Sequence, residues 1–402
     1  MALSKIDVAN MLTGATPVAN GGTAATTFAV AGLSKRPNAK PLIINGDMAV
    51  AQRSTSATSI TGNGLNSVDR MYWAINSIGT YTCAQESLTS GPAFEAGFAN
   101  AMRIDTTSAD ASPASADYLY LQYNMEGQDL QLFKKGTSSA EKFTLAFWVK
   151  SNKTGQANVE FKDKDNSNRH AIGSYTISSA DTWEHKIVVI NADTTGAFGD
   201  DNGKSLNINW WLDSGDNFTG VAEGDAAWLA NDADRANNDG ALQIARNTDN
   251  DWAITGVQLE VGEYTSTTIP PFQHESYGDN IARCKRYYQG WGSVYDTGTF
   301  GISGRTLSSN RFDSATITFI PEMRAAPTIA QGGTADVENY VFQSDGDSIT
   351  AGSGTSFAAL NTQKGSTKFR VTSNATLSAN RNANCQSGGD DGKQHLTFDA
   401  EL

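Results

Sequence analysis

The sequence predicts an all-β protein whose main part is a jelly-roll-like antiparallel β-sandwich. Short stretches alternate apolar and polar residues with the period of two that is typical of β-strands. The loops between them are rich in Asp, Asn, Gly and Ser. The chain has 38 glycines against 9 prolines and 3 cysteines, which favours many turns without a disulfide scaffold. The predicted order is an N-terminal segment, 1–40; the sandwich, 41–268; a proline corner and helix, 269–289; and a second, smaller β-sandwich, 290–402.

The N-terminal segment is not expected to form a core by itself. Ser4 followed by Asp7 predicts a capped helix that ends near Leu12. Residues 13–28 consist mainly of small residues and threonine, and such a stretch buries little apolar surface. It is either a flexible tail or a segment that becomes ordered against a partner or against copies of itself.

Two stretches of the sandwich region carry a clear strand pattern. Residues 143–149 (FTLAFWV) have apolar side chains on both faces, which is typical of a buried strand. Residues 183–190 (WEHKIVVI) repeat the alternation. Before them, the short apolar run 42–44 ends at Asn45-Gly46, a pair of residues that favours a tight turn.

A third strand pattern contains an irregularity. Residues 252–261 (WAITGVQLEV) alternate in two pieces, and the apolar face changes at Thr255-Gly256. A change of face within one strand predicts a β-bulge at that position.

Two oxygen-rich loops raise the question of a structural Ca²⁺ ion, because Ca²⁺ prefers carboxylate and carbonyl oxygens. Residues 163–170 contain Asp163, Asp165 and Asn168, but they lack the glycine of a calcium-binding loop. Residues 231–240 depart from that pattern as well. We interpret both loops as solvated turns and predict no metal site and no cofactor, with Ca²⁺ as the alternative.

Residues 269–289 predict the one strong helix in the body of the chain. Ser276 and Asp279 form a capping box after an extended proline segment. An apolar stripe on a helix must be covered, so it packs either on a sandwich or on symmetry mates as a trimer collar. The stripe consists of Tyr277, Ile281, Cys284 and Tyr288.

The charge of the chain argues against a nucleic-acid partner. Thirty basic and 43 acidic residues give a net charge of −13, whereas duplex binding needs a basic face. The basic cluster in the body of the chain is Arg283, Lys285 and Arg286. We interpret it as a solvated face or as a source of ion pairs between subunits with Asp279 or Glu275.

Membrane insertion and secretion are not expected. The sequence has no apolar run of 18 residues, and its first ten residues, MALSKIDVAN, lack the apolar centre of a signal peptide. The three cysteines, Cys83, Cys284 and Cys385, are widely spaced, which favours synthesis in a reducing compartment.

The C-terminal region returns to strand patterns. Residues 315–320 (ATITFI) alternate and end at Pro321. Residues 367–373 and 395–402 have a similar pattern. These stretches predict the second β domain.

Several stretches resemble the tail fibre or receptor-binding proteins of tailed bacteriophages. Residues 16–28 (TPVANGGTAATTF) are similar to a Gly-Gly-Thr-Gly-Ala-Thr segment of these fibres, with Ala24 in place of the second glycine. LIINGDMAVAQRS (42–54) with SVDRMYW (67–73) resembles the opening of their β-sandwich domain. The most specific stretch, 252–289, joins a closing strand, a proline corner and a capped helix. The C-terminal FDAEL is also similar, and together the matches cover about a fifth of the chain.

The resemblance implies a homotrimeric appendage of a virion, synthesised in the host cytoplasm. Its N-terminus would bind other tail or capsid proteins, and its C-terminal end would meet a glycan or protein on the host surface. We expect the receptor site on loops of residues 290–402. The residues expected at the virion attachment are Val18, Asn20, Gly21, Gly22 and Thr23.

Exposed aromatic side chains are the best candidates for glycan contacts, because sugar rings stack on them. Trp210-Trp211 places one indole on each face of a strand, and Trp228 lies beside an Asp/Asn-rich loop. Trp291 follows the helix, and Tyr295 lies close after it. The predicted glycan-binding residues are Trp210, Trp228, Trp291 and Tyr295.

We predict no catalytic residues. Glycan hydrolysis needs two carboxylates on either side of a bound sugar, and the acidic residues Glu184, Asp213, Asp216 and Glu260 are candidates only by type. The four histidines share no catalytic or metal-binding spacing. Three alternatives remain open: a purely architectural tail or capsid decoration protein, a glycan-degrading tailspike, and a cellular carbohydrate-binding module.

Overall fold

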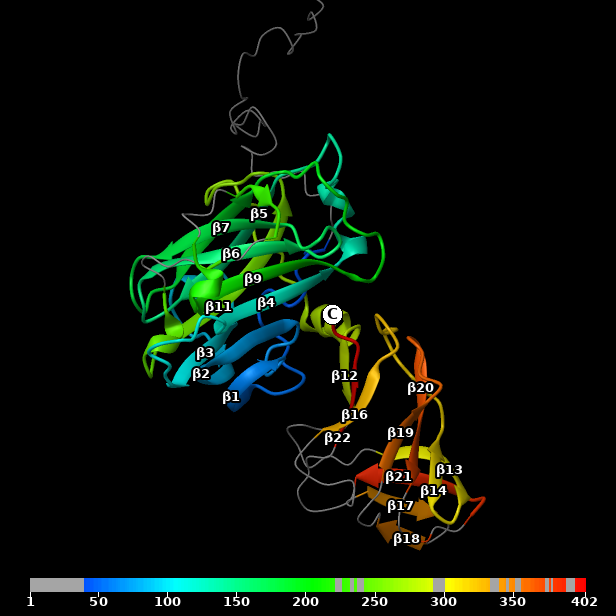
Figure 1. The fold of residues 1–402 in the computed structure, drawn as a ribbon. Helices are drawn as coiled ribbons and strands as arrows, with labels where there is room; N and C mark the ends of the chain where they lie inside the picture. Colours follow the sequence, from blue (N-terminus) through cyan, green and yellow to red (C-terminus); the bar gives the residue numbers. More distant parts are fainter. Residues whose placement is uncertain are drawn as a thin grey trace, which may run out of the picture.

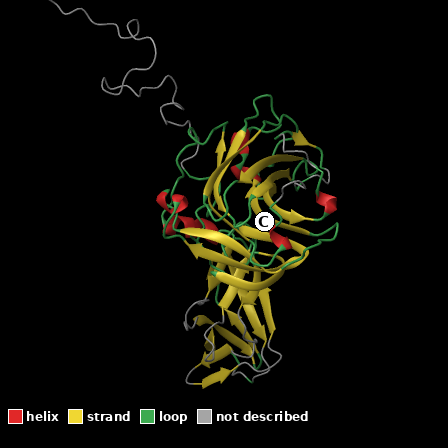
Figure 2. Cartoon of the chain, turned by 90° about the vertical axis from the view of Figure 1, so that its left-hand side faces the viewer, coloured by secondary structure: helices red, strands yellow, loops and turns green. Residues whose placement is uncertain are grey.

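The computed structural model confirms an all-β protein in which antiparallel strands form a large sandwich and a smaller second β region (Figures 1 and 2). It describes residues 40–220, 226–231, 235–236, 242–291, 301–332, 340–344, 347–350, 356–372, 376, 379–387 and 395–402. The predicted capped helix that begins at Ser4 and the whole segment 1–39 lie outside the described residues.

The sandwich is a single hydrogen-bonded path of strands that curls over to enclose a core. The strand order is β10-β7-β6-β9-β4-β2-β3-β11-β5-β8, with β1 paired to β2. A short helix, α1 (Pro92–Glu95), follows β2. The strands are β1 (Ser56–Gly64), β2 (Met71–Ser87), β3 (Asn100–Ser108), β4 (Tyr118–Glu126), β5 (Phe143–Lys150), β6 (Gly155–Asp163), β7 (His170–Ile177), β8 (Glu184–Ile190), β9 (Lys204–Ser214), β10 (Trp228–Leu229) and β11 (Asp251–Val261).

Strand β2 turns the path from one layer of the sandwich to the other. Its first part pairs with β4 up to Asn76, and its second part pairs with β3 from Thr80. Between them Ser77 and Gly79 have φ angles of 52° and 91°, and such residues bend and twist a strand. The apolar faces of the two layers therefore meet in one core.

The bulge predicted in residues 252–261 is confirmed in β11. Its pairing with β5 shifts register between Thr255 and Gln258, and Gly256 has a φ of 63°. The strands predicted at 143–149 and 183–190 are confirmed as β5 and β8.

The apolar run 42–44 leads directly into the predicted turn. Asn45 has a φ of 61°, and its side-chain amide donates hydrogen bonds to the Val50 and Asp69 carbonyls. Gly46 is needed here because a Cβ would lie 2.1 Å from the Val257 carbonyl oxygen.

Helix α2 (Tyr277–Lys285) begins at the predicted cap, where the Ser276 hydroxyl accepts a hydrogen bond from the Asp279 amide. Its apolar stripe packs on this chain's own sandwich: buried Cys284 and half-buried Ile281 contact the cluster of Ile44 and Val50. Two of the four predicted collar residues depart from this stripe. Tyr277 is 60% exposed, and Tyr288 lies beyond the helix in β12 (Tyr288–Trp291). The stripe thus does not need symmetry mates to be covered.

The second β region contains two sheets that share one core. One sheet has the order β12-β22-β16, and the other β15-β20-β14-β13-β21-β17-β18, with β19 paired to β20. Phe312 and Phe369 from the second sheet and Phe398 from the first belong to the same buried cluster. The further strands are β13 (Gly301–Ser308), β14 (Arg311–Ser314), β15 (Ile317–Thr318), β16 (Thr328–Gly332), β17 (Tyr340–Ser344), β18 (Asp347–Thr350), β19 (Ser356–Leu360), β20 (Ser366–Thr372), β21 (Asn382–Ser387) and β22 (His395–Asp399).

The predicted strands of this region are confirmed at two places and shortened at a third. Of the predicted 367–373, residues 367–372 belong to β20, and of 395–402, residues 395–399 form β22. Within 315–320 only Ile317–Thr318 is a strand. Ile320 is 80% exposed, because the chain leaves the sheet before Pro321, which cannot donate a ladder hydrogen bond.

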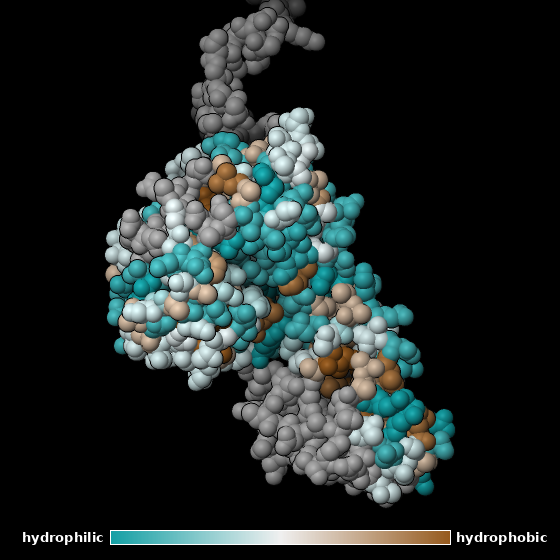
Figure 3. Space-filling model, in the orientation of Figure 1, coloured by the Kyte–Doolittle hydropathy of each residue, from teal (hydrophilic) through white to brown (hydrophobic). Residues whose placement is uncertain are grey.

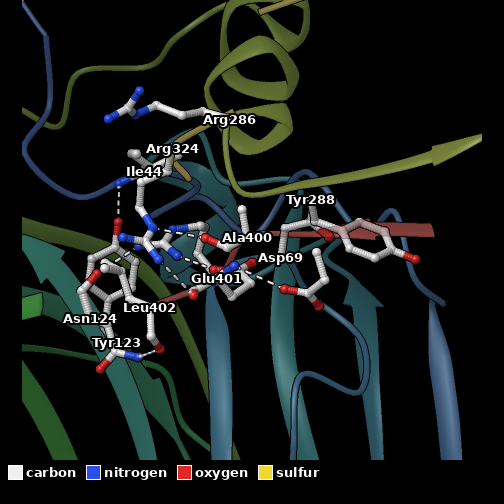
Figure 4. A network of polar contacts seen from close by, with 12 residues as sticks. Ile44, Asp69, Tyr123, Asn124, Arg286, Tyr288, Arg324, Ala400, Glu401 and Leu402 are labelled. Atoms are coloured by element: carbon white, nitrogen blue, oxygen red, sulfur yellow. Dashed lines mark hydrogen bonds and ion pairs between the residues drawn. The ribbon is translucent and has the colours of Figure 1, made fainter. Parts of the chain in front are cut away.

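The last residues of the chain return to the sandwich, and Figure 1 marks the C-terminus beside α2, between the two β regions. Buried Arg70 forms an ion pair with Glu401 and donates to the Asn124 carbonyl at 2.7 Å. Figure 4 shows two further bonds of this junction: the Asn124 amide donates to Leu402, and Arg324 donates to the Ala400 carbonyl. Residues 400–402 therefore lie at the junction between the two β regions.

The basic cluster on α2 forms ion pairs within the chain. Arg283 pairs with Glu275 at 2.6 Å, and Arg286 pairs with Glu126 at 2.7 Å. Of the two expected acidic partners, Glu275 is therefore a partner within the subunit. None of the described helices is long and apolar enough to cross a membrane.

Candidate functional site

A cleft of about 280 Å³ lies on the sandwich over strands β6, β9 and β4. Figure 1 shows these strands side by side, and the sandwich face in Figure 3 is largely hydrophilic. The lining side chains fall into an aromatic group, an amide and carboxylate group, and a basic group. They are Tyr118, Tyr120, Gln122, Glu160, Lys162, Lys164, Lys204, Asn207, Asn209, Trp211, Phe218 and Arg235.

Strand alternation places these side chains on one face. In β9 the core positions are Leu206, Ile208, Trp210 and Leu212, all of which are buried. The residues between them, including Asn207, Asn209 and Trp211, belong to the opposite face because successive side chains alternate. The same alternation places Tyr118, Tyr120 and Gln122 of β4, and Glu160 and Lys162 of β6, at the cleft.

The aromatic group forms one end of the cleft. The ring centroids of Tyr120 and Trp211, which pair directly across the strands, are 4.5 Å apart. Phe218 lies 5.5 Å from Trp211, and Tyr118 lies 5.6 Å from Phe218. Tyr118, Tyr120 and Phe218 are partly exposed, whereas Trp211 is 4% exposed. Phe218 belongs to a short 3-10 helix, η5 (Asp216–Phe218), which follows β9.

The buried carboxylate of Glu160 organises the middle of the cleft. It accepts hydrogen bonds from Asn209 Nδ2 at 2.8 Å and from Trp211 Nε1 at 3.2 Å. Its other oxygen lies 3.2 Å from Arg235 Nε and 3.2 Å from His170 Nδ1. Burial raises its pKa, but these hydrogen bonds and the nearby positive charges outweigh burial and leave the pKa below its ordinary value. Glu160 therefore acts as an ionised carboxylate that orients Asn209 and Trp211 through hydrogen bonds.

The side-chain amides of Gln122 and Asn209, in the middle of the cleft, are oriented by the same hydrogen-bond network. Gln122 Nε2 donates to Asn209 Oδ1 at 2.9 Å, and Asn209 in turn donates to Glu160. A hydrogen-bonded chain of this kind holds its donors and acceptors in fixed positions. The cleft thus offers preoriented polar groups beside aromatic rings.

The basic group forms the other end of the cleft. Lys162 and Lys204 are half-buried, and Lys164 is exposed. Burial lowers the pKa of Lys162, the nearby Glu160 carboxylate opposes this shift, and the charges of Arg235 and Lys164 add to it. Burial and the charge of Lys164 likewise lower the pKa of Lys204. The lysines therefore repel one another across the cleft.

Two of the predicted glycan-binding residues are wrong. Trp210 is fully buried, and its ring meets Phe147 at a centroid distance of 6.0 Å. Trp228 is also buried, and its Nε1 donates to the Asn191 carbonyl at 2.9 Å. Both belong to the core because their strand neighbours place them on the apolar face.

The other predicted contacts remain predictions. The backbone of Trp291 ends β12 and pairs with Leu396. Tyr295 lies outside the described residues, and so do the proposed attachment residues Val18, Asn20, Gly21, Gly22 and Thr23.

The sequence analysis missed Tyr118, Tyr120 and Trp211, although the signal was present. The segment YLYLQYNME (118–126) places Leu119 and Leu121 in the core and leaves two tyrosines on the polar face. In NINWWLD (207–213), Ile208, Trp210 and Leu212 are two residues apart, so their side chains lie on the same face of the strand. The alternation of side chains along the strand therefore identifies Trp211, and not Trp210, as the indole at the cleft.

A lysine occupies the centre of the oxygen-rich loop for which Ca²⁺ was the alternative. Buried Lys135 Nζ lies 2.6 Å from Asp163 and 3.0 Å from Asp193. It also donates to the Thr195 and Gly196 carbonyls, both at 2.9 Å. Within the described parts of the chain, no cluster of metal-ligating side chains is present. Asp163 is therefore paired inside the protein, whereas Asp165 is exposed, and most of the second loop, 231–240, lies outside the described residues.

Chelation of divalent cations is therefore expected to leave the melting temperature unchanged. The ammonium of Lys135 already supplies the positive charge that Asp163 and Asp193 need. Differential scanning fluorimetry with EGTA, compared with added CaCl₂, measures this. A lower melting temperature in EGTA would reveal a cation site and contradict the expectation.

Two of the acidic residues considered for hydrolysis are engaged in ion pairs. Asp213 pairs with Arg246 at 3.1 Å, and Glu184 pairs with Lys186 at 2.5 Å. Neither residue lines the cleft.

No protein-family model and no curated protein matches this chain. Similar solved structures include the enzymatically active domain of tailspike protein 4 from bacteriophage CBA120, with a TM-score of 0.29 and 11% identity over 55% of this chain and 21% of that one. A putative sugar binding protein from Bacteroides thetaiotaomicron has a TM-score of 0.29 and 16% identity over 55% of this chain and 100% of that one. A family 11 carbohydrate-binding module from Clostridium thermocellum has a TM-score of 0.25 and 10% identity over 52% and 99%. Similarities this low say nothing about what this chain binds.

Proposed function

We propose that this protein binds a saccharide in the cleft over β4, β6 and β9. The observation that carries the proposal is the aromatic group beside the oriented amides of Gln122 and Asn209. Ligand sites commonly combine apolar or aromatic walls with a few placed polar groups. Sugar rings suit this combination, because their C–H faces stack on aromatic rings while their hydroxyls exchange hydrogen bonds with amides.

The groove that the described residues form in the second β region is a weaker candidate than the cleft. Its volume is about 700 Å³, but among the residues that line this groove none is aromatic. The groove includes Ser303, Arg305, Asp313, Lys368 and Asn384. Without rings on which a sugar can stack, this surface supports glycan binding less well than the cleft does.

The biological setting that we propose is a tail fibre-like structural protein of a bacteriophage virion. This part rests on the sequence resemblance of 16–28, 42–54 and 252–289. In this proposal the protein is a non-enzymatic homotrimer, residues 1–40 bind other virion proteins, and saccharide binding attaches the particle to the host surface. The exposed Tyr277 on α2 is the predicted collar residue that remains free for a contact between subunits.

Replacing Tyr118 or Tyr120 by alanine is expected to weaken glycan binding roughly tenfold or more, which corresponds to about 1.4 kcal/mol. Each variant removes a partly exposed ring from the aromatic group. Binding of the full-length protein to intact candidate host cells, followed by flow cytometry, measures the effect. The matched control is Phe94→Ala, which removes a ring that is 44% exposed on α1, outside the cleft.

The outcomes separate the functional classes. Equal binding by the wild type and both tyrosine variants would exclude the cleft as the receptor site. Absence of cell binding by a protein that still assembles onto particles would favour a purely architectural role. Time-dependent shortening of host polysaccharide by the pure protein would favour a glycan-degrading tailspike. A chain truncated at Gly290 is less informative, because it also removes Glu401 from buried Arg70.

A further inference from the structure

We propose that the ligand of the cleft is an acidic saccharide, whose carboxylate, phosphate or sulfate group lies among Lys162, Lys164 and Lys204. The inference rests on the proposed function and specifies the ligand class of the same site. It is carried by the placement of three ammonium groups at one end of an aromatic cleft.

What distinguishes these three lysines is that they lie together at the cleft without an ion-pair partner; Lys40, Lys153, Lys285, Lys364 and Lys368 are also unpaired among the described residues, but they do not line the cleft. Among the described residues, none of the three forms an ion pair, and Lys164 has only a hydrogen bond to the Asn168 side chain. Other lysines of the sandwich do have carboxylate partners within 4 Å: Lys134, Lys135, Lys142, Lys150 and Lys186.

The one carboxylate among the described lining residues, Glu160, attracts Lys162, but it is a single negative charge beside Lys162, Lys164, Lys204 and Arg235. Glu160 already faces Arg235 Nε at 3.2 Å and His170 Nδ1 at 3.2 Å, and it accepts two further hydrogen bonds. The cleft keeps an excess of positive charge that a ligand anion can neutralise.

Burial is the main cause of the lowered pKa values of Lys162 and Lys204, and repulsion by the charge of Lys164 lowers both pKa values further. An anion between them would remove this repulsion and raise both pKa values. Binding of an acidic ligand is then favoured by the relief of repulsion as well as by direct attraction.

The two ends of the cleft require an extended ligand. Lys162 pairs with Asn207, four residues along β9 from Trp211. With a rise of about 3.3 Å per residue, the ring end and the lysine end are about 13 Å apart. A small inorganic anion cannot reach both ends, whereas an oligosaccharide with an acidic substituent can. The lysines form one cluster and not a continuous basic track, so a nucleic acid fits this surface less well.

The experiment uses an array of oligosaccharides that carry uronic acids, sialic acids or sugar phosphates. Each is printed beside a neutral counterpart in which the carboxylate is reduced to an alcohol or the phosphate is removed. The full-length wild type is compared with Tyr118→Ala and with the triple variant Lys162→Gln, Lys164→Gln, Lys204→Gln. Lys204→Gln alone is included in case the triple variant does not fold, and Lys153→Gln, a lysine outside the cleft, is the matched control.

The expected result is that the wild type prefers an acidic member over its neutral counterpart by roughly tenfold or more, and that added salt weakens this preference. The triple variant should lose the preference, Tyr118→Ala should lose binding, and Lys153→Gln should behave as wild type. Equal binding of acidic and neutral members that depends on Tyr118 would overturn the acidic ligand but not saccharide binding. Lysine-dependent binding of a single-stranded oligonucleotide, with no array member bound, would overturn both, and so would binding to neither probe.

Discussion

Replacing Arg70 by methionine is expected to lower the free energy of unfolding by about 3–5 kcal/mol. The side chain of Arg70 is 2% exposed, and its guanidinium pairs with Glu401 and donates to the Asn124 carbonyl. It also lies 3.5 Å from the ring centroid of Tyr287. The variant leaves Glu401, whose side chain is 10% exposed, beside Arg53 alone, with which it forms a longer ion pair at 3.5 Å. Urea unfolding followed by tryptophan fluorescence measures the loss.

Two further single variants and one double variant show whether the ion pair itself causes the loss. Arg103→Met removes an arginine that is 35% exposed, and it should cost about 1 kcal/mol or less. Glu401→Gln should cost a similar amount to Arg70→Met, and the double variant should lose less than the sum of the two because the residues are coupled. Equal losses from Arg70→Met and Arg103→Met would show that the buried pair does not hold the C-terminus in place.

The second large effect is expected from Lys135→Met, again about 3–5 kcal/mol. The ammonium of Lys135 lies between the carboxylates of Asp163 and Asp193, whose side chains are 0% and 6% exposed. Without it, two buried carboxylates face each other, although Arg169 still pairs with Asp193 at 3.4 Å. The neighbouring Lys134→Met is the matched control, since Lys134 and Glu141 are 51% and 42% exposed.

The pH dependence of stability should change sign in this variant. In the wild type, burial raises the pKa of Asp193, but hydrogen bonds from Thr195 and Lys135 and the charge of Lys135 outweigh burial and lower the pKa. A lowered pKa contributes stability above the ordinary pKa of about 3.9, and this stability is lost as the pH falls through the folded-state value. In Lys135→Met the two carboxylates should have raised pKa values, so the stability contribution is present at low pH and is lost as the pH rises. Thermal unfolding from pH 4 to 7 measures this. A deficit that is the same at every pH would contradict the electrostatic explanation.

Local patterns predicted several strands of the sandwich and the start of α2, but of the three strands that carry the cleft only β9 was treated as a strand, through Trp210-Trp211. The alternation in 143–149 and 183–190 led to β5 and β8, and the change of face at Thr255-Gly256 led to the bulge in β11. The Ser276 cap gave the correct start of α2. These features depend on neighbours within a few residues, so they can be read from the order of the amino acids.

The residues at the cleft were partly accessible to the same reasoning. Strand parity in 118–126 and in 206–212 separates the core side chains from those of the polar face, and it identifies Tyr118, Tyr120 and Trp211. The alternation of side chains does not show that β4, β9 and β6 are adjacent in the sheet. That adjacency comes from the register of strands far apart in the chain, such as Tyr120 opposite Trp211 and Val159 opposite Trp210.

The sequence by itself determined the all-β class, the bulge, the capped helix and the excess of acidic residues. Only the tertiary structure decided which groups meet: Glu160 with Arg235, Lys135 with Asp193, Arg70 with Glu401, and the three lysines with the aromatic cleft. The physical reason is that strand alternation and capping are local, whereas an ion pair or a cleft depends on which distant strands share a sheet. Those pairings are selected by burial of the common core, and a single sequence does not display them.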